Sequence, residues 1–157
     1  MLKLTKKADY ALIAVKHLAE CGQGACSAKD IAEAYAMPPP ALAKILQRLV
    51  KAGVLQSQHG TNGGYALARD ARTITAFEVI KSIDGPLLIT SCTTNHGDCS
   101  QSSRCTVREP LRKVNESIQD VLSRITIADM KDAAAAHVHE EKEKPADELV
   151  GITAIAN

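Results

Sequence analysis

The chain has 157 residues, enough for one domain of ordinary size or for a small domain with an appendage. It contains one Phe and no Trp, so its core is expected to consist of Leu, Ile, Val and Ala. The net charge is +1, but residues 1–75 carry ten Lys and Arg against five Asp and Glu, whereas residues 76–157 carry nine against thirteen. The basic first half indicates contact with a polyanion.

The start of the chain does not have the pattern of a secretory leader, because its basic residues lead to Asp9 rather than to an apolar run. No stretch reaches the roughly 18 apolar residues of a membrane span. The sequence therefore predicts a cytoplasmic protein with no membrane partner. Disulfides are rare in that compartment, and the number of cysteines, five, is odd.

The first half predicts a helix-turn-helix. Apolar residues at helical spacing predict a first helix at 9–21, and Ser27 begins a capping box for a second helix at 28–35. Three prolines at 38–40 break that helix, and proline is tolerated in the first turn of the third helix, at 39–52. Two helices joined by a tight turn are the pattern of many DNA-binding proteins.

The third helix carries a basic face. Leu42, Ile45, Leu46 and Leu49 are expected to point inward, and Lys44, Arg48 and Lys51 share the outer face. A solvated charged surface is the common reason for such a stripe. Here the stripe falls on the second helix of a helix-turn-helix, which is the helix that enters a major groove, so we expect these three residues to contact DNA.

A wing is predicted directly after this helix. Short strands at 54–57 and 64–68 flank a glycine-rich turn that contains His59, Thr61 and Asn62. Side chains at the tip of a wing can reach a phosphate or a narrow minor groove. The glycines would also let backbone amides approach a phosphate closely. We therefore add these three residues to the predicted DNA contacts.

The stretch SCTTNHGDCSQSSRC at 91–105 has no helical or strand period, yet it holds three thiols, Cys92, Cys99 and Cys105. Three interpretations are open: a disulfide with a spare thiol, a structural zinc ion, or an iron–sulfur cluster. Zinc sites favour gaps of two to four residues, whereas the gaps here are six and five. The open spacing favours an iron–sulfur cluster, which needs a fourth ligand from elsewhere. Cys21 and Cys26 lie outside this set and are interpreted as ordinary, partly buried thiols.

Helices are predicted on both sides of the cysteine loop. Capping boxes begin at Thr75, Thr106 and Thr126, and the second of them opens a long helix with one apolar stripe. Such a helix after a complete small domain is expected to pack on a second copy of the chain. The expected organisation is a DNA-binding domain at 1–84, a cluster-binding loop at 85–105, dimerisation helices at 106–136 and a disordered tail at 137–157.

The order of these parts resembles the Rrf-two family, the IscR/NsrR-type winged-helix transcription regulators. The resemblance is carried by Leu4-Thr-Lys-Lys-Ala-Asp-Tyr-Ala-Leu12, Gly60-x-x-Gly-Gly-Tyr65, Ile83-Asp-Gly-Pro86 and the three cysteines before a long helix. It implies a mainly α fold and a bacterial cytoplasmic homodimer that regulates transcription from palindromic promoter DNA and is not an enzyme. It also implies an iron–sulfur cluster, with 4Fe–4S favoured and 2Fe–2S as the alternative. The members it most resembles control iron–sulfur assembly operons of the SUF type, so the expected role is that of a repressor of iron–sulfur biogenesis or iron homeostasis genes.

The resemblance also bears on the fourth ligand. Where IscR has a histidine ligand, three residues after its last cysteine, this chain has Arg108. NsrR-type members use an aspartate near the N-terminus, and Asp9 lies in the matching motif, so Asp9 of the partner subunit is the expected ligand. An N-cap is the more common role for an aspartate there. His96 and Asp98 are rival ligands within the loop.

Overall fold

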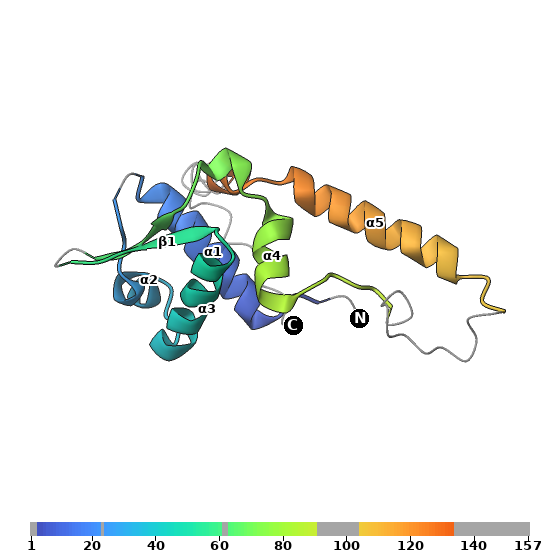
Figure 1. The fold of residues 1–157 in the computed structure, drawn as a ribbon, viewed down its shortest axis with the longest axis horizontal. Coiled ribbons are helices and arrows are strands. Elements are labelled where there is room, and N and C mark those ends of the chain that lie inside the picture. Colours follow the sequence, from blue (N-terminus) through green and yellow to red (C-terminus); the bar gives the residue numbers. More distant parts are fainter. Residues whose placement is uncertain (1–2, 23, 61–62, 91–103, 134–157) are drawn as a thin grey trace, which may run out of the picture.

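A computed structural model of the chain describes residues 3–22, 24–60, 63–90 and 104–133. Its helices and strands follow in the order α1 (Lys6–Glu20), α2 (Ala28–Ala34), α3 (Pro39–Lys51), β1 (Leu55–Gln58), β2 (Gly64–Leu67), η1 (Ala71–Thr73), α4 (Ala76–Asp84) and α5 (Arg108–Arg124). A further helical segment covers 127–133. The helices α1 to α4 and the hairpin form one body, from which α5 extends (Figure 1). The mainly helical winged-helix prediction is confirmed.

The first helix begins three residues earlier than predicted. Thr5 is its N-cap, with the side-chain oxygen accepting a hydrogen bond from the Ala8 amide at 3.2 Å. Thr5 also donates from Oγ1 to Asp84 Oδ1 at 2.6 Å, which ties the start of α1 to the end of α4. The sequence pattern missed this start because a threonine cap followed by two lysines has no apolar period.

The core lies where α1 packs against α3 and α4. The inward stripe of α3 is confirmed, since all four of its predicted core side chains are buried. Burying a side chain of this size stabilises the fold by about 1.5–3 kcal/mol. The largest fully buried side chains of the whole core are Leu18, Ile31, Leu42, Leu46, Leu49, Leu55, Ile74, Ile80, Ile127, Val15, Val54 and Val79.

The wing is an antiparallel hairpin with a short third segment beside it. Leu55 pairs with Leu67, and Cys26 forms an isolated bridge to Tyr65 through reciprocal backbone hydrogen bonds of 3.0 and 2.9 Å. Because Cys26 crosses so close, a Cβ on Gly64 would lie 2.4 Å from the Cys26 carbonyl oxygen. Close packing of the backbone thus requires a glycine here, whatever its role toward phosphate.

The C-terminal end of α5 is fastened to the start of α4. The Ala76 amide donates to the Ile125 carbonyl at 2.8 Å, and the Ile127 amide donates to the Ile74 carbonyl at 2.9 Å. The capping box predicted at Thr126 is confirmed, with Thr126 and Asp129 each accepting the other's backbone amide. Hydrogen bonds from the Thr126 side chain and backbone hold the pKa of Asp129 below its usual range.

The capping box predicted at Thr106 is wrong. Val107 occupies the N-cap position of α5, and no side chain caps the helix there. Glu109 instead pairs with Arg112, whose Nε donates to Glu109 Oε2 at 3.0 Å. That hydrogen bond, reinforced by the charge of the guanidinium, lowers the pKa of Glu109. An ion pair within the helix has therefore replaced the expected contact with the helix start.

Candidate functional site

The outer face of α3 exposes Lys44, Arg48 and Lys51, as the sequence predicted. Arg48 is also engaged within the protein, because its Nη1 donates to the carbonyl oxygen of Ile83 at 3.2 Å, near the end of α4. Among the ion pairs of the described residues, none includes Lys44 or Lys51. Their charges are therefore available to an anionic partner, and Arg48 links the same surface to α4.

A hollow of about 340 Å³ lies beside this face and brings in Lys7, a residue that the sequence reasoning missed. The hollow is lined by Lys7, Pro40, Ala41, Lys44, Ile45, Arg48 and Ile83. Lys7 belongs to the first turn of α1, more than thirty residues from Lys44 in the sequence. The pairing of Lys6 and Lys7 marked a basic start, but only packing of α1 on α3 brings that charge to the basic face.

The wing contributes one described residue to the predicted DNA contacts. His59 is exposed directly after β1. Thr61 and Asn62 lie outside the described residues, so their predicted contacts stay predictions.

Only part of the predicted ligand set lies within the described residues. Cys105 is half-buried and carries a free thiol three residues before α5 begins. Cys92, Cys99, His96 and Asp98 lie outside the described residues. Whether the three thiols share one site therefore stays a prediction.

The segment before the cysteine loop lies along α5. The side-chain amide of Gln119 donates to the Leu87 carbonyl at 3.0 Å, and the Ile89 amide donates to Asn115 Oδ1 at 3.1 Å. As the segment advances by two residues, its partner on α5 moves four residues back toward the helix start. The described chain therefore runs toward the Cys105 end of α5, and Cys92 follows two residues after Thr90.

Asn115 is the one buried polar side chain among the described residues, 7% exposed. Replacing Asn115 by Ala leaves the Ile89 amide without its partner, which costs about 1–3 kcal/mol when the amide is buried. We expect Asn115→Ala to lower the midpoint of urea unfolding and to shorten the lifetime of any group bound at the cysteines. Ser123→Ala is the matched control, because Ser123 is an exposed polar residue of the same helix and does not line its hollow. Equal lifetimes of the bound group in the two variants would show that the contact between Asn115 and the segment before the cysteine loop does not stabilise the site.

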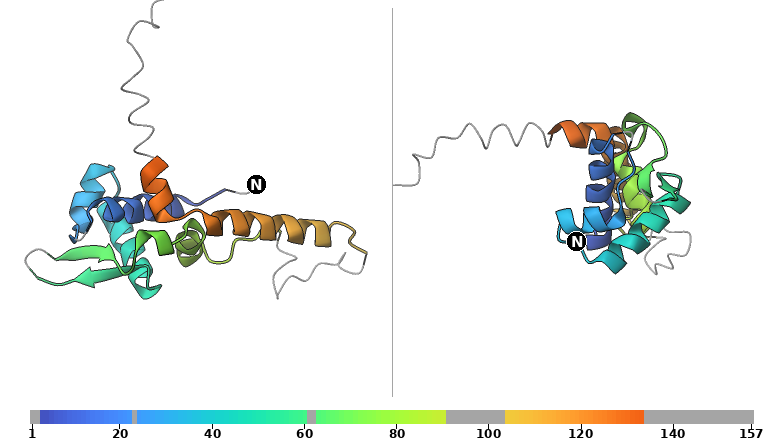
Figure 2. Two further views of the ribbon diagram at one scale, coloured as in Figure 1. Left: turned by 90° about the horizontal axis from the view of Figure 1, so that it is seen from above. Right: turned by 90° about the vertical axis from the view of Figure 1, so that its left-hand side faces the viewer.

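Asp9 is exposed in the first turn of α1. The alternative that Asp9 serves as the N-cap is wrong, because Thr5 fills that role. In Figures 1 and 2 the end at which α5 begins points away from α1. The 17 residues of α5 span about 25 Å. Within one chain, α1, which carries Asp9, therefore lies apart from the start of α5, which follows Cys105 in the sequence.

The apolar stripe of α5 is largely uncovered. Val107, Val114, Val121 and Ile125 are 56%, 48%, 58% and 38% exposed. A shallow hollow on the same helix is lined by Lys113, Val114, Ser117, Ile118, Val121 and Leu122. An apolar row of this length is unusual on a surface that faces only water. None of the helices within the described ranges has the length and apolar content to cross a bilayer.

Comparison with known proteins places the chain among transcription regulators. The model of the Rrf2 family, described as an iron-dependent transcriptional regulator, matches residues 4–133. The HTH-type transcriptional regulator IscR of Vibrio campbellii is 31% identical over 144 residues, which cover 90% of this chain and 85% of that protein. Protein aau3 of Rhizobium meliloti is 33% identical over 130 residues, which cover 82% of this chain and 84% of that protein.

Two solved structures show the same fold. CymR, the global cysteine regulator of B. subtilis, has a TM-score of 0.69 and 28% identity, with 85% of this chain and 98% of that chain covered. The IscR of T. potens has a TM-score of 0.65 and 33% identity, with 92% and 93% covered. The winged helix, its basic face and these matches agree, and the chain belongs to the Rrf2 family of DNA-binding transcriptional regulators.

Proposed function

We propose that this protein is an iron–sulfur cluster-sensing repressor that acts as a cytoplasmic homodimer on the promoters of iron–sulfur biogenesis or iron homeostasis genes. The observation that carries the proposal is the run Cys92-x6-Cys99-x5-Cys105, which directly precedes the long helix of an Rrf2-family chain, a helix with one apolar stripe. Thiolates are the ligands that iron–sulfur clusters use, and the loop has almost no apolar residues with which to fold around its own core.

A second copy of the chain is the proposed occupant of the apolar face of α5. The exposed residues Val107, Val114 and Val121 repeat every seven positions, which is the spacing of one seam in a pair of packed helices. The Lys113 side chain beside this seam would stay in water while its stem covers apolar surface. The same pairing would set the spacing of two α3 helices, which must match half-sites about 34 Å apart.

In this proposal Cys92, Cys99 and Cys105 hold the cluster, and the partner subunit's Asp9 completes the site. The bound cluster supplies chemistry that responds to iron–sulfur status, oxygen or nitric oxide. The donor set fits, since thiolates suit iron and an exposed aspartate without a capping role is available. Glu109 is a poorer candidate, because it is already paired with Arg112.

The described contacts support a route by which the proposed site would act on DNA binding. Cys105 lies just before α5, and the far end of α5 is bonded to the start of α4 through Ile125 and Ala76. The end of α4 accepts the hydrogen bond of Arg48, which lies on the basic face of α3. Ordering or release of the loop at Cys105 would thus act on α5 and, through α4, on the orientation of α3.

Three alternative functions are a nitric oxide or redox sensor, a zinc or thiol regulator and an electron-transfer protein. A nitric oxide or redox sensor of the same family would use the same thiols, whereas a zinc or thiol regulator would bind no sulfide. CymR is a cysteine regulator, but the three-thiol loop of this chain favours a cluster over a small-molecule signal. An electron-transfer protein is the weakest alternative, because it would have no use for a basic recognition helix and a wing.

The proposal is tested by native mass spectrometry of protein purified without oxygen, together with iron and acid-labile sulfide assays. We expect a dimer whose mass includes equal amounts of iron and sulfide in each subunit. Zinc without sulfide would support the zinc alternative, and a metal-free monomer that still binds DNA would contradict the proposal.

Asp9 of one subunit is expected to ligate the cluster held by the cysteines of the other. Asp9→Ala should therefore alter the visible spectrum of the homodimer. A heterodimer decides the geometry: one chain carries Asp9→Ala with intact cysteines, and the other keeps Asp9 but lacks all three loop cysteines. Ligation between subunits gives this heterodimer one complete site and restores the native spectrum in half the subunits.

Each alternative has its own outcome in this experiment. A normal spectrum from the Asp9→Ala homodimer would show that Asp9 is not a ligand and would turn attention to His96 and Asp98. An altered homodimer that the heterodimer does not restore would rule out ligation from the partner. Asp30→Ala is a suitable control, since Asp30 is likewise an exposed aspartate in the first turn of a helix.

A further inference from the structure

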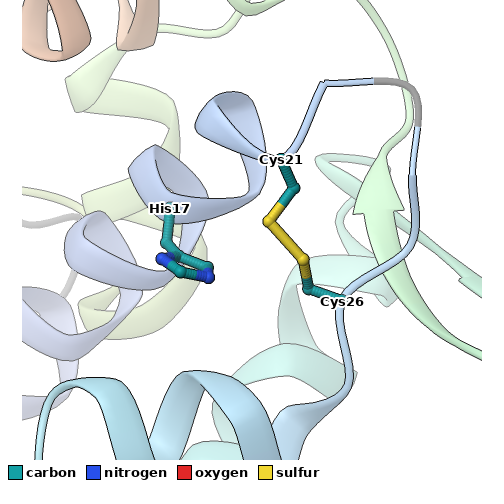
Figure 3. A group of neighbouring side chains, drawn as sticks. All are labelled: His17, Cys21 and Cys26. Atoms are coloured by element: carbon teal, nitrogen blue, oxygen red, sulfur yellow. A yellow bond between two sulfur atoms is a disulfide. The ribbon is translucent and has the colours of Figure 1, made fainter.

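A second group of metal-binding side chains lies away from the cysteine loop, where α1 ends beside the wing. His17, Cys21 and Cys26 each offer one ligand atom, and these three atoms lie within 4.8 Å of one another (Figure 3). All three residues are half-buried. The interpretation of Cys21 and Cys26 as ordinary thiols is wrong, because the structure joins their sulfurs in a disulfide, whereas their partial burial is confirmed.

The local sequence has the spacing of a metal site. His17 and Cys21 are four residues apart at the end of α1, so both project from the same side of the helix. Four residues separate Cys21 from Cys26, within the two to four that zinc sites use between cysteines. The turn between them begins at Gly22, whose φ of +68° is a conformation that other residues rarely adopt.

The separation of the backbone atoms also suits a bridging ion. The Cα atoms of Cys21 and Cys26 are 7.0 Å apart, whereas disulfides usually span about 4.4–6.8 Å. Two thiolates on one tetrahedral zinc ion lie about 3.8 Å apart, because each Zn–S bond is about 2.3 Å. The two positions can therefore hold an ion between their sulfurs without bringing the backbone closer.

Tyr35 orients the imidazole. His17 Nδ1 and Tyr35 Oη are 3.2 Å apart, and the two rings meet edge to face. In the tautomer with the proton on Nδ1, this hydrogen bond is donated to Tyr35 and Nε2 carries the lone pair that a metal requires. A partner on the other ring nitrogen is typical of histidine ligands.

We propose that the reduced Cys21 and Cys26 thiolates and His17 Nε2 form a second metal site, which takes a thiophilic divalent cation of the zinc class. Two sulfurs and one nitrogen match the preference of zinc, with water completing the tetrahedron. Reduction by a phosphine opens the disulfide: the phosphine gives two electrons to the sulfurs, and one water supplies the two thiol protons and the oxygen of the phosphine oxide. The ion then displaces the thiol protons.

The position of the site gives it a consequence for the wing. Cys26 is bonded through its backbone to Tyr65 of β2, and Tyr35 directly follows α2, the first helix of the helix-turn-helix. An ion here would join the end of α1 to strand β2 of the wing through Cys26 and Tyr65. This consequence for DNA binding rests on the proposed function, whereas metal binding itself does not.

The experiment uses the full chain with Cys92, Cys99 and Cys105 changed to Ser, so that Cys21 and Cys26 are the remaining cysteines. After anaerobic reduction with a phosphine, a thiol assay should find two thiols per chain. Titration with Co²⁺ should then give one ion per chain, with thiolate-to-cobalt charge transfer and the visible bands of tetrahedral cobalt. Zn²⁺ should displace it.

Variants separate this site from adventitious binding. Cys21→Ser and His17→Gln should each abolish or shift the cobalt bands, while Tyr35→Phe should keep them with about tenfold weaker affinity. His59→Ala, at an exposed histidine outside this group, should leave the cobalt bands unchanged. The proposal is overturned if the disulfide resists reduction, if two free thiols bind no cobalt, or if the bands survive Cys21→Ser in a chain whose circular dichroism shows it folded. None of these outcomes touches the cluster proposal, because its cysteines are absent from the test.

Discussion

Changing Cys92, Cys99 and Cys105 together to Ala should remove all bound iron and sulfide and the visible absorption that accompanies them. The reason is chemical, since neither alanine nor the hydroxyl and amide side chains around these positions replace thiolate as a cluster ligand. The fold should survive, because the core is built from α1, α3 and α4. The measurements are iron and sulfide content and the visible spectrum of protein purified without oxygen.

The matched control changes the other two cysteines. A Cys21→Ser, Cys26→Ser chain has also lost thiols, but it should keep its iron, its sulfide and its spectrum. Together the two variants distinguish a cluster in the loop from iron bound by any available thiol. Unchanged iron and sulfide after loss of the three loop cysteines would mean that the cluster, if there is one, is held elsewhere.

The sequence alone predicted the fold of the DNA-binding domain, because the local helix and turn signals there agree with the residues that the structure buries. Proline, glycine and an apolar period mark α3, and its inward residues pack as the pattern predicts. The start of α1 was missed because Thr5 and the two lysines after it have no apolar period, and because the bond from Thr5 to Asp84 joins residues 79 positions apart. Likewise, Lys7 reaches the basic face only through the packing of α1 on α3.

The two groups of cysteines differ in how much of their role the sequence alone reveals. The loop cysteines stand out because nothing around them builds a core, so their chemistry can be read from the sequence alone. Cys21 and Cys26 are surrounded by ordinary helix and loop residues, and their relation appears only when Tyr65 holds Cys26 beside the end of α1. The four-residue spacing of His17 and Cys21 was visible in the sequence. It indicates a metal site only if the chain turns back at Gly22 and brings Cys26 to them.

Replacing Lys44, Arg48 and Lys51 together by Ala should weaken promoter binding by about a thousandfold at about 0.1 M salt. Each phosphate contact releases about 0.9 of a condensed counterion, which corresponds to roughly a tenfold gain in affinity at that salt concentration. The loss should be similar for specific and nonspecific DNA, because phosphate contacts carry no sequence information. Binding measured over a range of salt should show a slope reduced by about three units.

The single variants test the surface more sharply. Lys44→Ala removes a charge that has no ion-pair partner among the described residues, so it should reduce the salt slope by about one unit and leave folding stability unchanged. Lys131→Ala is the control, because Lys131 is exposed on the segment 127–133, which lies apart from α3 in Figures 1 and 2. Arg48→Ala should differ from Lys44→Ala, since losing the bond to the Ile83 carbonyl lowers the free energy of unfolding by about 1 kcal/mol as well.

Wild-type affinity in the triple variant would rule out α3 as the helix that meets DNA. An equal loss in Lys44→Ala and Lys131→Ala would mean that only the overall charge of the protein attracts DNA. If Arg48→Ala lowers stability but leaves the salt slope unchanged, Arg48 serves to fasten α3 to α4, and the DNA contacts belong to the two lysines. Lys7→Ala then becomes the decisive variant, because Lys7 lines the same hollow beside Lys44 and would supply the third charge.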